Sequence, residues 1–186
     1  MGVVFAITGP PGVGKSTLVS KVVYRLKSAG VIVGGFTTAE KRSGGVRVGF
    51  KINDLTRQMT GTLASAESKI GPKVGRYRVN LTDLTTVGAA GLRAAAETSE
   101  VIVVDEVGPM ELVSPEFKRG VRACLDSGKP MLVVLHERFD DDLLNALRSS
   151  ATSTFALTVE NRDSAADEIA SLLLKEAGGP KTSVAP

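Results

Sequence analysis

The chain alternates short apolar runs with segments of helical periodicity, a pattern typical of a parallel sheet with helices on both faces. The first apolar run covers residues 3–8, and apolar side chains at helical spacing follow it from about Lys15. After a second apolar run at residues 31–37, the alternation pauses and then resumes near residue 100. There the pattern predicts strands over residues 101–104, 131–135 and 154–159, and helices over residues 115–127, 140–148 and 163–177.

The interrupted stretch has a different pattern. Ser43-Gly44-Gly45 is a turn signal, and residues 46–52 alternate apolar and polar side chains, as a strand with one buried face does. We therefore predict an antiparallel β insertion over about residues 35–63, after the second strand. Residues 64–84 contain Gly71-Pro72 and are predicted to be irregular, with a helix over residues 85–98 after them. The predicted fold is an α/β three-layer sandwich with a mainly parallel central sheet.

Size and composition fit one globular domain. The chain has 186 residues, of which 42% are hydrophobic and 23% are charged. We expect a single domain over residues 1–177 and a flexible C-terminal tail over residues 178–186. Lysine plus arginine outnumber aspartate plus glutamate by only 23 to 20, an excess too small to argue for nucleic acid. The one cysteine, Cys124, lies on the apolar face of a predicted helix, and we interpret it as a packing residue.

The first apolar run also bears on where the protein is found. It stops at Thr8, far short of the roughly 20 residues that a membrane span needs. It lacks the basic flank and the cleavage site of a secretory peptide. We therefore expect a cytoplasmic protein that does not enter a membrane, and we expect it to be a monomer.

A phosphate-binding motif joins the first predicted strand to the first predicted helix. It matches G-x-x-x-x-G-K-[ST] at every fixed position and consists of Gly9, Pro10, Pro11, Gly12, Val13, Gly14, Lys15 and Ser16. The glycines let backbone N–H groups turn toward phosphates, and the helix N-terminus adds its positive end. Lys15 would reach the β- and γ-phosphates, and the Ser16 hydroxyl would ligate Mg²⁺. The alternative is a glycine-rich turn that merely joins a strand to a helix, and the correct flanking elements argue against it.

Two acidic residues follow the most apolar predicted strand. Asp105 comes directly after residues 101–104, so its carboxylate should face the crevice where α/β sheets bind ligands and should hold Mg²⁺. Glu106 lies beside this metal ligand, where a carboxylate can orient and deprotonate a water molecule. The alternative interpretation of Glu106 is a solvated loop residue. The two motifs together predict an enzyme that hydrolyses a nucleoside triphosphate.

Three further residues have both a functional and an ordinary interpretation. Glu111 is either a carboxylate that supports the metal site from behind or a surface charge. His136, the only histidine, follows a predicted strand and either contacts the γ-phosphate or is an ordinary satisfied polar residue. Arg138 either stabilises charge in the transition state or flanks a helix at the surface.

Beyond these motifs, nearly the whole chain from Val3 to about Ile169 resembles the THEP-type (cancer-related) nucleoside-triphosphatases. The most specific shared segment is V-I-V-V-D-E-V-G-P-M-E-L at residues 101–112. Other shared segments are G-P-P-G-V-G-K-S-T at residues 9–17, G-G-F-T-T-A-E at 34–40, G-G-V-R-V-G-F at 44–50, V-G-R-Y at 74–77 and T-V-E-N-R at 158–162.

The resemblance implies a RecA/AAA-like P-loop domain that slowly hydrolyses ATP, GTP and other nucleoside triphosphates with Mg²⁺. It supports Glu106 as the base that activates water and favours a functional role for Glu111. It also implies that Thr17, Asn161 and Arg162 contact the nucleotide. The family commonly has adjacent His and Arg after the fourth core strand, whereas this chain reads His136-Glu137-Arg138, which weakens the assignment of Arg138.

Two other classes of protein stay open. G-P-P-G-x-G-K also resembles adenylate kinase, so a nucleotide or small-molecule kinase is the enzyme alternative, although we find no Arg-rich lid between the later strands. The other alternative is an NTP-dependent switch or an RNA-associated binding protein. No Asn is followed by Lys, as a guanine-reading motif requires, and no basic run is interleaved with aromatic residues. Arg76 and Arg78 flank Tyr77 and either clamp a phosphate or a base, or lie in a solvated loop.

Overall fold

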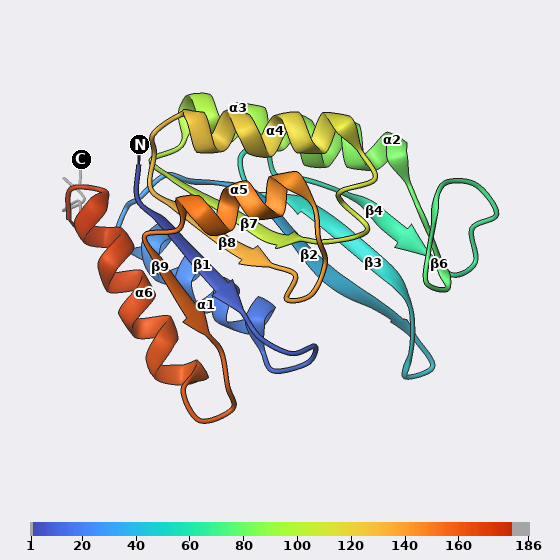
Figure 1. The fold of residues 1–186 in the computed structure, drawn as a ribbon, viewed down its shortest axis with the longest axis horizontal. Coiled ribbons are helices and arrows are strands. Elements are labelled where there is room, and N and C mark those ends of the chain that lie inside the picture. The colour runs from blue at the N-terminus through green and yellow to red at the C-terminus, as the bar shows by residue number, and fades with distance from the viewer. Residues whose placement is uncertain (1, 180–186) are drawn as a thin grey trace.

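The computed structural model describes residues 2–179, and the strands among them form one nine-stranded sheet (Figure 1). The strands are β1 (Val4–Thr8), β2 (Val33–Ser43), β3 (Val46–Asp54), β4 (Met59–Ser65), β5 (Lys73–Val74), β6 (Tyr77–Val79), β7 (Val101–Val107), β8 (Met131–Leu135) and β9 (Ser153–Ala156). Their order across the sheet is β5-β6-β4-β3-β2-β7-β8-β1-β9. The strands from β2 to β9 in this order pair in parallel, whereas those from β5 to β2 pair antiparallel.

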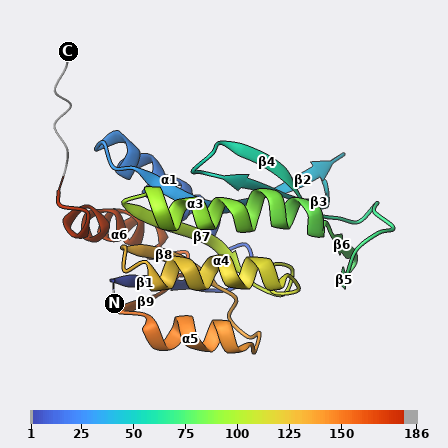
Figure 2. The same ribbon diagram turned by 90° about the horizontal axis from the view of Figure 1, so that it is seen from above.

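Helices cover both faces of the sheet, and on one side they extend from the parallel strands onto β3 and β4. The helical segments are α1 (Lys15–Ser28), α2 (Leu81–Asp83), the π-helical η1 (Leu84–Ala89), α3 (Ala90–Thr98), α4 (Pro115–Asp126), α5 (Asp142–Ser150) and α6 (Arg162–Glu176). α1 and α6 pack on one face, and η1, α3, α4 and α5 pack on the other, with α3 beside α4 (Figure 2). The prediction of an α/β three-layer fold with an antiparallel insertion is therefore confirmed.

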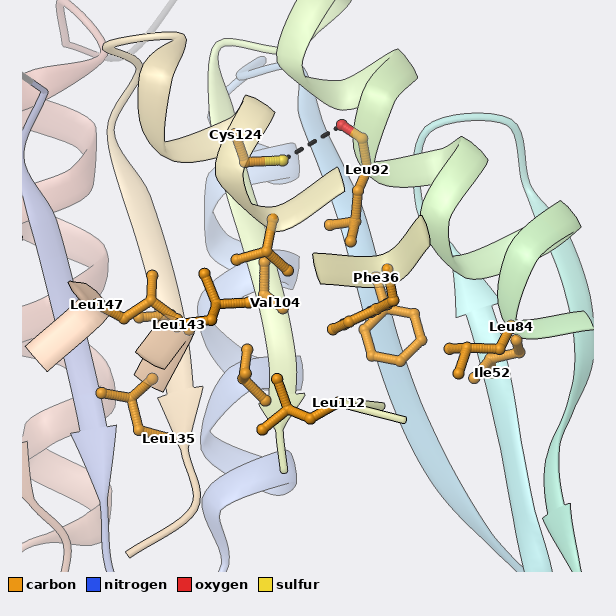
Figure 3. Close-up of a cluster of buried hydrophobic side chains, with 14 of the residues drawn as sticks. Phe36, Ile52, Leu84, Leu92, Val104, Leu112, Cys124, Leu135, Leu143 and Leu147 are labelled. Carbon is orange, nitrogen blue, oxygen red and sulfur yellow. Dashed lines mark hydrogen bonds between the residues drawn. The ribbon is translucent and has the colours of Figure 1, made fainter. Parts of the chain in front are cut away.

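The central strands are apolar along the parts that are covered on both faces. In β7, Val101 and Val103 belong to the core under α1 and α6, whereas Ile102 and Val104 belong to the core under α3, α4 and α5. Figure 3 shows the second core, where Val104 lies among side chains from the sheet and from the covering helices. The two cores thus pack against both faces of β7 and fix the position of its acidic C-terminal end.

α4 begins where the sequence predicts. The Ser114 side chain accepts a hydrogen bond from the backbone N–H of Phe117 at 3.1 Å, and Pro115 occupies the first helical position. Farther along α4, Cys124 is fully buried and donates its S–H to the carbonyl oxygen of Leu92 at 3.3 Å (Figure 3). The interpretation of Cys124 as a packing residue is confirmed.

The antiparallel insertion is larger than predicted. β2 runs on to Ser43, and the sheet continues beyond β4 into β5 and β6. The prediction that residues 64–84 are irregular was wrong, because this stretch holds β5, β6, α2 and the first residue of η1. β6 is short and gains its hydrogen bonds from β4, where Ala64 pairs with Val79. Gly71-Pro72 lies in the connection from β4 to β5, and the carbonyl oxygen of Pro72 accepts a hydrogen bond from the N–H of Val79 in β6. The local turn residues therefore hid a pairing with a distant partner.

The end of the last helix follows the prediction closely. α6 ends at Glu176, and Gly178 and Gly179 adopt φ values of 88° and 86° after it. The rest of the predicted flexible tail, residues 180–186, lies outside the described residues. Within residues 2–179 we find no helix that combines the length and the apolar character of a membrane span. The single-domain boundary at residue 177 stays a prediction.

Candidate active site

The carboxyl ends of β1, β2, β7 and β8 meet at one edge of the sheet, which is where open α/β sheets bind ligands. A cavity of about 680 Å³ opens at this edge. It is lined by the phosphate-binding motif, by the exposed part of β2 and β3, and by the segments that follow β7 and β8. The lining residues are Gly9, Pro10, Pro11, Gly12, Gly14, Lys15, Ser16, Thr17, Thr38, Ala39, Glu40, Phe50, Glu106, His136, Glu137 and Arg138.

The phosphate-binding loop wraps around the Lys15 ammonium. The Nζ of Lys15 donates to the carbonyl oxygens of Gly9 at 2.7 Å and Pro10 at 3.2 Å. Gly14 caps α1 in a left-handed conformation with φ 111°, which a residue with a side chain rarely adopts, and the first helical N–H groups follow it. The loop therefore presents a cation and a helix N-terminus to the same space, which is the requirement for binding phosphate.

One residue of the motif faces away from the cavity. The side chain of Val13 is buried in the core under α1 and α6, so only its backbone belongs to the phosphate-binding surface. The carbonyl oxygen of Val13 accepts a hydrogen bond from Nη1 of Arg162 at 3.4 Å. Arg162 thus braces the loop from outside.

Asp105 is buried beneath the phosphate-binding loop. It is 1% exposed, and its Oδ1 has no hydrogen-bond partner in the described structure. Burial raises the pKa of Asp105 to about 7; Glu106 adds to the shift, whereas Ser16 and the Lys15 ammonium oppose it. An unpartnered buried carboxylate oxygen next to a serine hydroxyl is a favourable place for a cation.

Glu106 and Glu111 converge on Gly108. A Cβ atom added to Gly108 would lie 3.2 Å from Oε1 of Glu106, 3.4 Å from Oε2 of Glu111 and 3.5 Å from the Cβ of His136. Glu106 lines the cavity, and the Asp105–Glu106 peptide bond is cis. Burial raises the pKa of Glu106 above its ordinary value, while Lys15 and His136 counteract the shift. A side chain at Gly108 would therefore separate the groups that meet there.

Glu111 lies behind the cavity wall rather than on it. It is 5% exposed, and its Oε2 accepts a hydrogen bond from the N–H of Gly108 at 3.1 Å. Burial raises the pKa of Glu111 to about 8, and the negative charge of Glu106 adds to the shift. Of the two interpretations offered by the sequence, a surface charge does not fit this position.

His136 and Arg138 both line the cavity, with Glu137 between them. The Nδ1 of His136 accepts hydrogen bonds from the backbone N–H groups of Phe139 at 3.1 Å and Arg138 at 3.4 Å. A neutral imidazole that accepts at Nδ1 carries its proton on Nε2, so this ring is a hydrogen-bond donor at its other nitrogen. The extra Glu137 does not push Arg138 out of the cavity wall.

Asn161 and Arg162 are not among the residues that line the cavity. The Oδ1 of Asn161 accepts from the N–H of Thr158 at 2.8 Å, and its Nδ2 donates to the carbonyl oxygen of Ala156 at 2.9 Å. These bonds shape the turn after β9. Nucleotide contacts by Asn161 and Arg162 stay a prediction.

Comparison with known proteins identifies the family. A family model described as NTPase matches residues 4–170, which is most of the chain. This chain belongs to the NTPase family. A relative from Thermofilum pendens, named nucleoside-triphosphatase THEP1, is 43% identical over 177 residues and covers 92% of this chain and 97% of its own. A protein of the same name from Methanosarcina acetivorans is 42% identical, with 93% and 98% covered.

Solved structures of the NTPase family agree with the fold. The crystal structure of THEP1 from Aquifex aeolicus matches with a TM-score of 0.78 at 32% identity, covering 92% of this chain and 99% of the other. The solution structure of a human cancer-related nucleoside triphosphatase matches with a TM-score of 0.77 at 34% identity, covering 94% and 98%. The resemblance seen in the sequence is therefore confirmed, and so is a P-loop fold.

The sequence did not predict one wall of this NTPase cavity. Thr38, Ala39, Glu40 and Phe50 line it, and all four come from the extended part of β2 and β3. Thr37 pairs with Asp105 across β2 and β7, so the residues that follow Thr37 necessarily lie at the same edge as the acidic pair. The second strand predicted from the sequence ended at residue 37, and no sequence pattern could show its register against β7. The residues after Thr37 were therefore not expected at the cavity.

The donor set of this NTPase fits Mg²⁺. Magnesium takes oxygen ligands and is held by one or two protein groups together with phosphates and water. Asp105 and Ser16 supply such oxygens, and the unpartnered Oδ1 of Asp105 would gain a partner. In the described part of the chain, no group of three or more His, Cys, Asp or Glu side chains could hold a metal ion alone. A site completed by the phosphates of a nucleotide is consistent with this.

Proposed function

We propose that the protein hydrolyses nucleoside triphosphates, ATP and GTP among them, to the diphosphate and phosphate, with Mg²⁺ and with Glu106 as the base. The observation that carries the proposal is the position of Glu106. It lines the same cavity as Lys15 and the phosphate-binding loop, and it is the acidic residue directly beyond the buried Asp105. The curated relatives that match nearly the whole chain are named nucleoside-triphosphatases, which supports hydrolysis as the reaction.

The loop residues would bind and orient the triphosphate. Backbone N–H groups at the start of α1 point toward the phosphates, and the Lys15 ammonium bridges the β- and γ-phosphates. Ser16 and Asp105 would hold Mg²⁺, which when bound neutralises charge on the phosphate oxygens. Binding would therefore hold the γ-phosphate close to the acidic end of β7.

Glu106 would prepare the attacking water. Its partial burial raises the pKa of the carboxyl, which brings the group closer to the range in which a base is effective at neutral pH. It would take a proton from water as the water oxygen attacks the γ-phosphorus and the nucleoside diphosphate departs. Glu111, held by the N–H of Gly108, would fix the turn that positions Glu106.

His136 and Arg138 would stabilise the charge that develops on the transferred phosphoryl group. The Nε2–H of His136 is available as a donor, because Nδ1 already accepts two backbone hydrogen bonds. Arg138 lines the cavity three positions beyond the end of β8. Donors placed where charge develops lower the barrier most when they need not reorganise.

The experiment that tests the function measures phosphate release from ATP, GTP, CTP and UTP, each with and without candidate phosphate acceptors. We expect phosphate release without any acceptor, and release should require Mg²⁺. Transfer of phosphate to an acceptor in preference to water would contradict hydrolysis and establish a kinase instead. The ranking of the four substrates defines the base preference.

A further inference from the structure

Positive charge gathers on the antiparallel part of the sheet. Residues 40–78 hold nine Lys or Arg and three Asp or Glu, a net charge of +6, whereas the remaining residues hold 14 and 17, a net charge of −3. One of the three acids, Asp54, is buried and paired with Arg57 inside this region. Figure 1 shows β2 and β3 running on past the parallel strands, so the charge lies on an extension of the sheet. A polyanion would be attracted to this extension rather than to the molecule as a whole.

Arg47 lies at the centre of the arginine–aromatic cluster, which we define as Glu40, Arg42, Arg47, Phe50, Arg76 and Tyr77. The Nε of Arg47 donates to the Tyr77 hydroxyl at 3.0 Å. Its guanidinium carbon lies 5.2 Å from the ring centre of Phe50 and 6.0 Å from that of Tyr77. The guanidinium of Arg76 lies 5.1 Å from the Tyr77 ring and donates to the backbone carbonyl of Arg47. Two guanidinium groups are thus held in place over aromatic rings.

Arg42 joins the cluster through the only acidic member. The carboxylate of Glu40 lies 2.6 Å from Nη2 of Arg42 and 2.8 Å from Nη1 of Arg47. Hydrogen bonds from Arg47 and then Arg42 lower the pKa of Glu40, so this carboxylate stays ionised. One carboxylate against three guanidinium groups leaves the cluster positive. The ion pairs with Glu40 also order the Arg42 and Arg47 side chains before a ligand binds. Less side-chain entropy is therefore lost on binding.

We propose that this arginine–aromatic cluster binds single-stranded nucleic acid. Arginine guanidinium groups contact the phosphates of a strand, and their planes also stack against unpaired bases, as exposed aromatic rings do. The Arg42 and Arg47 side chains are 56% and 43% exposed, so a strand can reach them. The bases of a duplex stack on one another and are not available to stack on a guanidinium group. Guanidinium groups that stack on bases therefore favour a single strand over a duplex.

Strand pairing assembles the cluster from residues that lie far apart in the sequence. Arg47 and Tyr77 are brought together by β3, β4 and β6, which is why no linear run of basic and aromatic residues announces the site. Glu40 and Phe50 also line the nucleotide cavity. A strand bound to the cluster would therefore lie directly beside a bound nucleotide, and the cluster is a second site rather than part of the phosphate-binding loop.

The test measures binding of fluorescent oligonucleotides of about 20 nucleotides, a length that spans typical single-strand sites. The probes are oligouridylate, oligothymidylate and a DNA duplex, and vesicles rich in anionic phospholipid are a separate probe. Binding is measured over a series of salt concentrations and without any nucleoside triphosphate, so the result is independent of the hydrolysis assay. The test variant is R42Q/R76Q, which removes two exposed guanidinium groups that do not line the cavity. The control is K27Q/R93Q, with the same charge change on exposed helix positions.

We expect the wild type to bind oligouridylate, oligothymidylate or both more tightly than the duplex. The preference between the two shows whether the natural ligand is RNA or DNA. R42Q/R76Q should bind roughly tenfold more weakly or worse, and its slope of log affinity against log salt should fall by about 1.4, because each single-strand phosphate contact contributes about 0.7. K27Q/R93Q should bind as the wild type does, and thermal melting checks that both variants fold. The proposal is overturned if the wild type binds the duplex more tightly than the single strands, or if it binds vesicles and no oligonucleotide. It is also overturned if the wild type binds none of the probes, or if the two variants lose equal affinity.

Discussion

Three carboxylates lie at and just beyond the end of β7, each in a different environment. Burial raises the pKa of Asp105 to about 7 and that of Glu111 to about 8, and it raises the pKa of Glu106, the one that lines the cavity. The three positions differ in what each can reach. Asp105 faces Ser16, Glu111 receives the N–H of Gly108, and Glu106 faces the space above Lys15. Substitution of each residue should therefore give a different phenotype.

Replacing Glu106 with Gln should slow hydrolysis while leaving nucleotide binding intact. Glutamine keeps the size of the side chain but cannot take a proton from water, and loss of a positioned base costs roughly 10²–10⁴-fold in rate. Lys15, Ser16 and Asp105, which we propose as the ligands of the nucleotide and Mg²⁺, are unchanged in this variant. Single-turnover hydrolysis and NTP affinity are the measurements.

The matched control is Glu137→Gln, because Glu137 lines the same cavity but follows β8. A loss of similar size in both variants would mean that the negative charge of the cavity, and not one base, sets the rate. Lost nucleotide affinity in Glu106→Gln would make Glu106 part of the metal site.

Replacing Glu111 with Gln should change how stability depends on pH. Burial raises the pKa of Glu111 from the ordinary 4.5 of an unfolded chain to about 8 in the folded protein, so its raised pKa favours the fold below pH 4.5. That contribution is lost as the pH rises from 4.5 through about 8, because the buried group must ionise. Glutamine cannot ionise, and its amide oxygen still accepts from the N–H of Gly108.

The measurement is the urea midpoint of wild type and Glu111→Gln at a series of pH values. The wild type should lose stability relative to the variant across this window. Parallel curves from pH 4.5 to pH 8 would show that Glu111 ionises freely in the folded protein.

At the scale of elements, the Arg57 guanidinium is one of the groups that connect the antiparallel extension to the helical layer. The side chain of Asp54 is fully buried and pairs with Nε of Arg57 at 2.5 Å. The Nη2 of Arg57 donates to the carbonyl oxygens of Thr86 at 2.7 Å and Val87 at 3.3 Å, in the π-helical η1. The turn after β3 and η1 are therefore joined through one guanidinium group.

Arg57→Ala should destabilise the protein by about 1–3 kcal/mol, because it leaves a buried carboxylate with fewer donors. Asp54 keeps the backbone N–H groups of Thr56 and Arg57, which limits the loss. Chemical denaturation measures the change, and Lys51→Ala on the exposed side of β3 is the control. An unchanged midpoint in Arg57→Ala would show that the backbone donors alone satisfy Asp54.

Local signals predicted most elements of the parallel half well. The phosphate-binding motif marked the start of α1, and Ser114-Pro115 marked the start of α4, because caps depend on neighbouring residues. The pairing of β4 with β6 and the contact of Arg47 with Tyr77 depend on residues far apart in the chain, so no local pattern showed them. The same reason explains why Phe50 was missed as a cavity residue while Glu106, placed by a strand end, was not.

For the whole molecule, binding energy and folding energy are linked. A ligand that binds only the folded state stabilises it by about 2.7 kcal/mol when present at 100 times its dissociation constant. Lys15, Ser16 and Asp105 come from α1 and β7, which share the core under α1 and α6. A nucleotide with Mg²⁺ would therefore tie together two elements that must separate on unfolding.

A nonhydrolysable ATP analogue with Mg²⁺ should raise the melting temperature of the wild type by roughly 5–10 °C at saturating concentration. Chelation of the metal should remove most of the shift and should also abolish hydrolysis, since Asp105 would lose the cation that its buried oxygen needs. Lys15→Ala should melt close to the wild type without ligand, because the Lys15 ammonium donates its hydrogen bonds to loop carbonyls and not to the core, but it should show little shift with the ligand. A full shift in excess chelator would contradict the assignment of Ser16 and Asp105 as metal ligands, and a full shift in Lys15→Ala would move the phosphate site away from the loop.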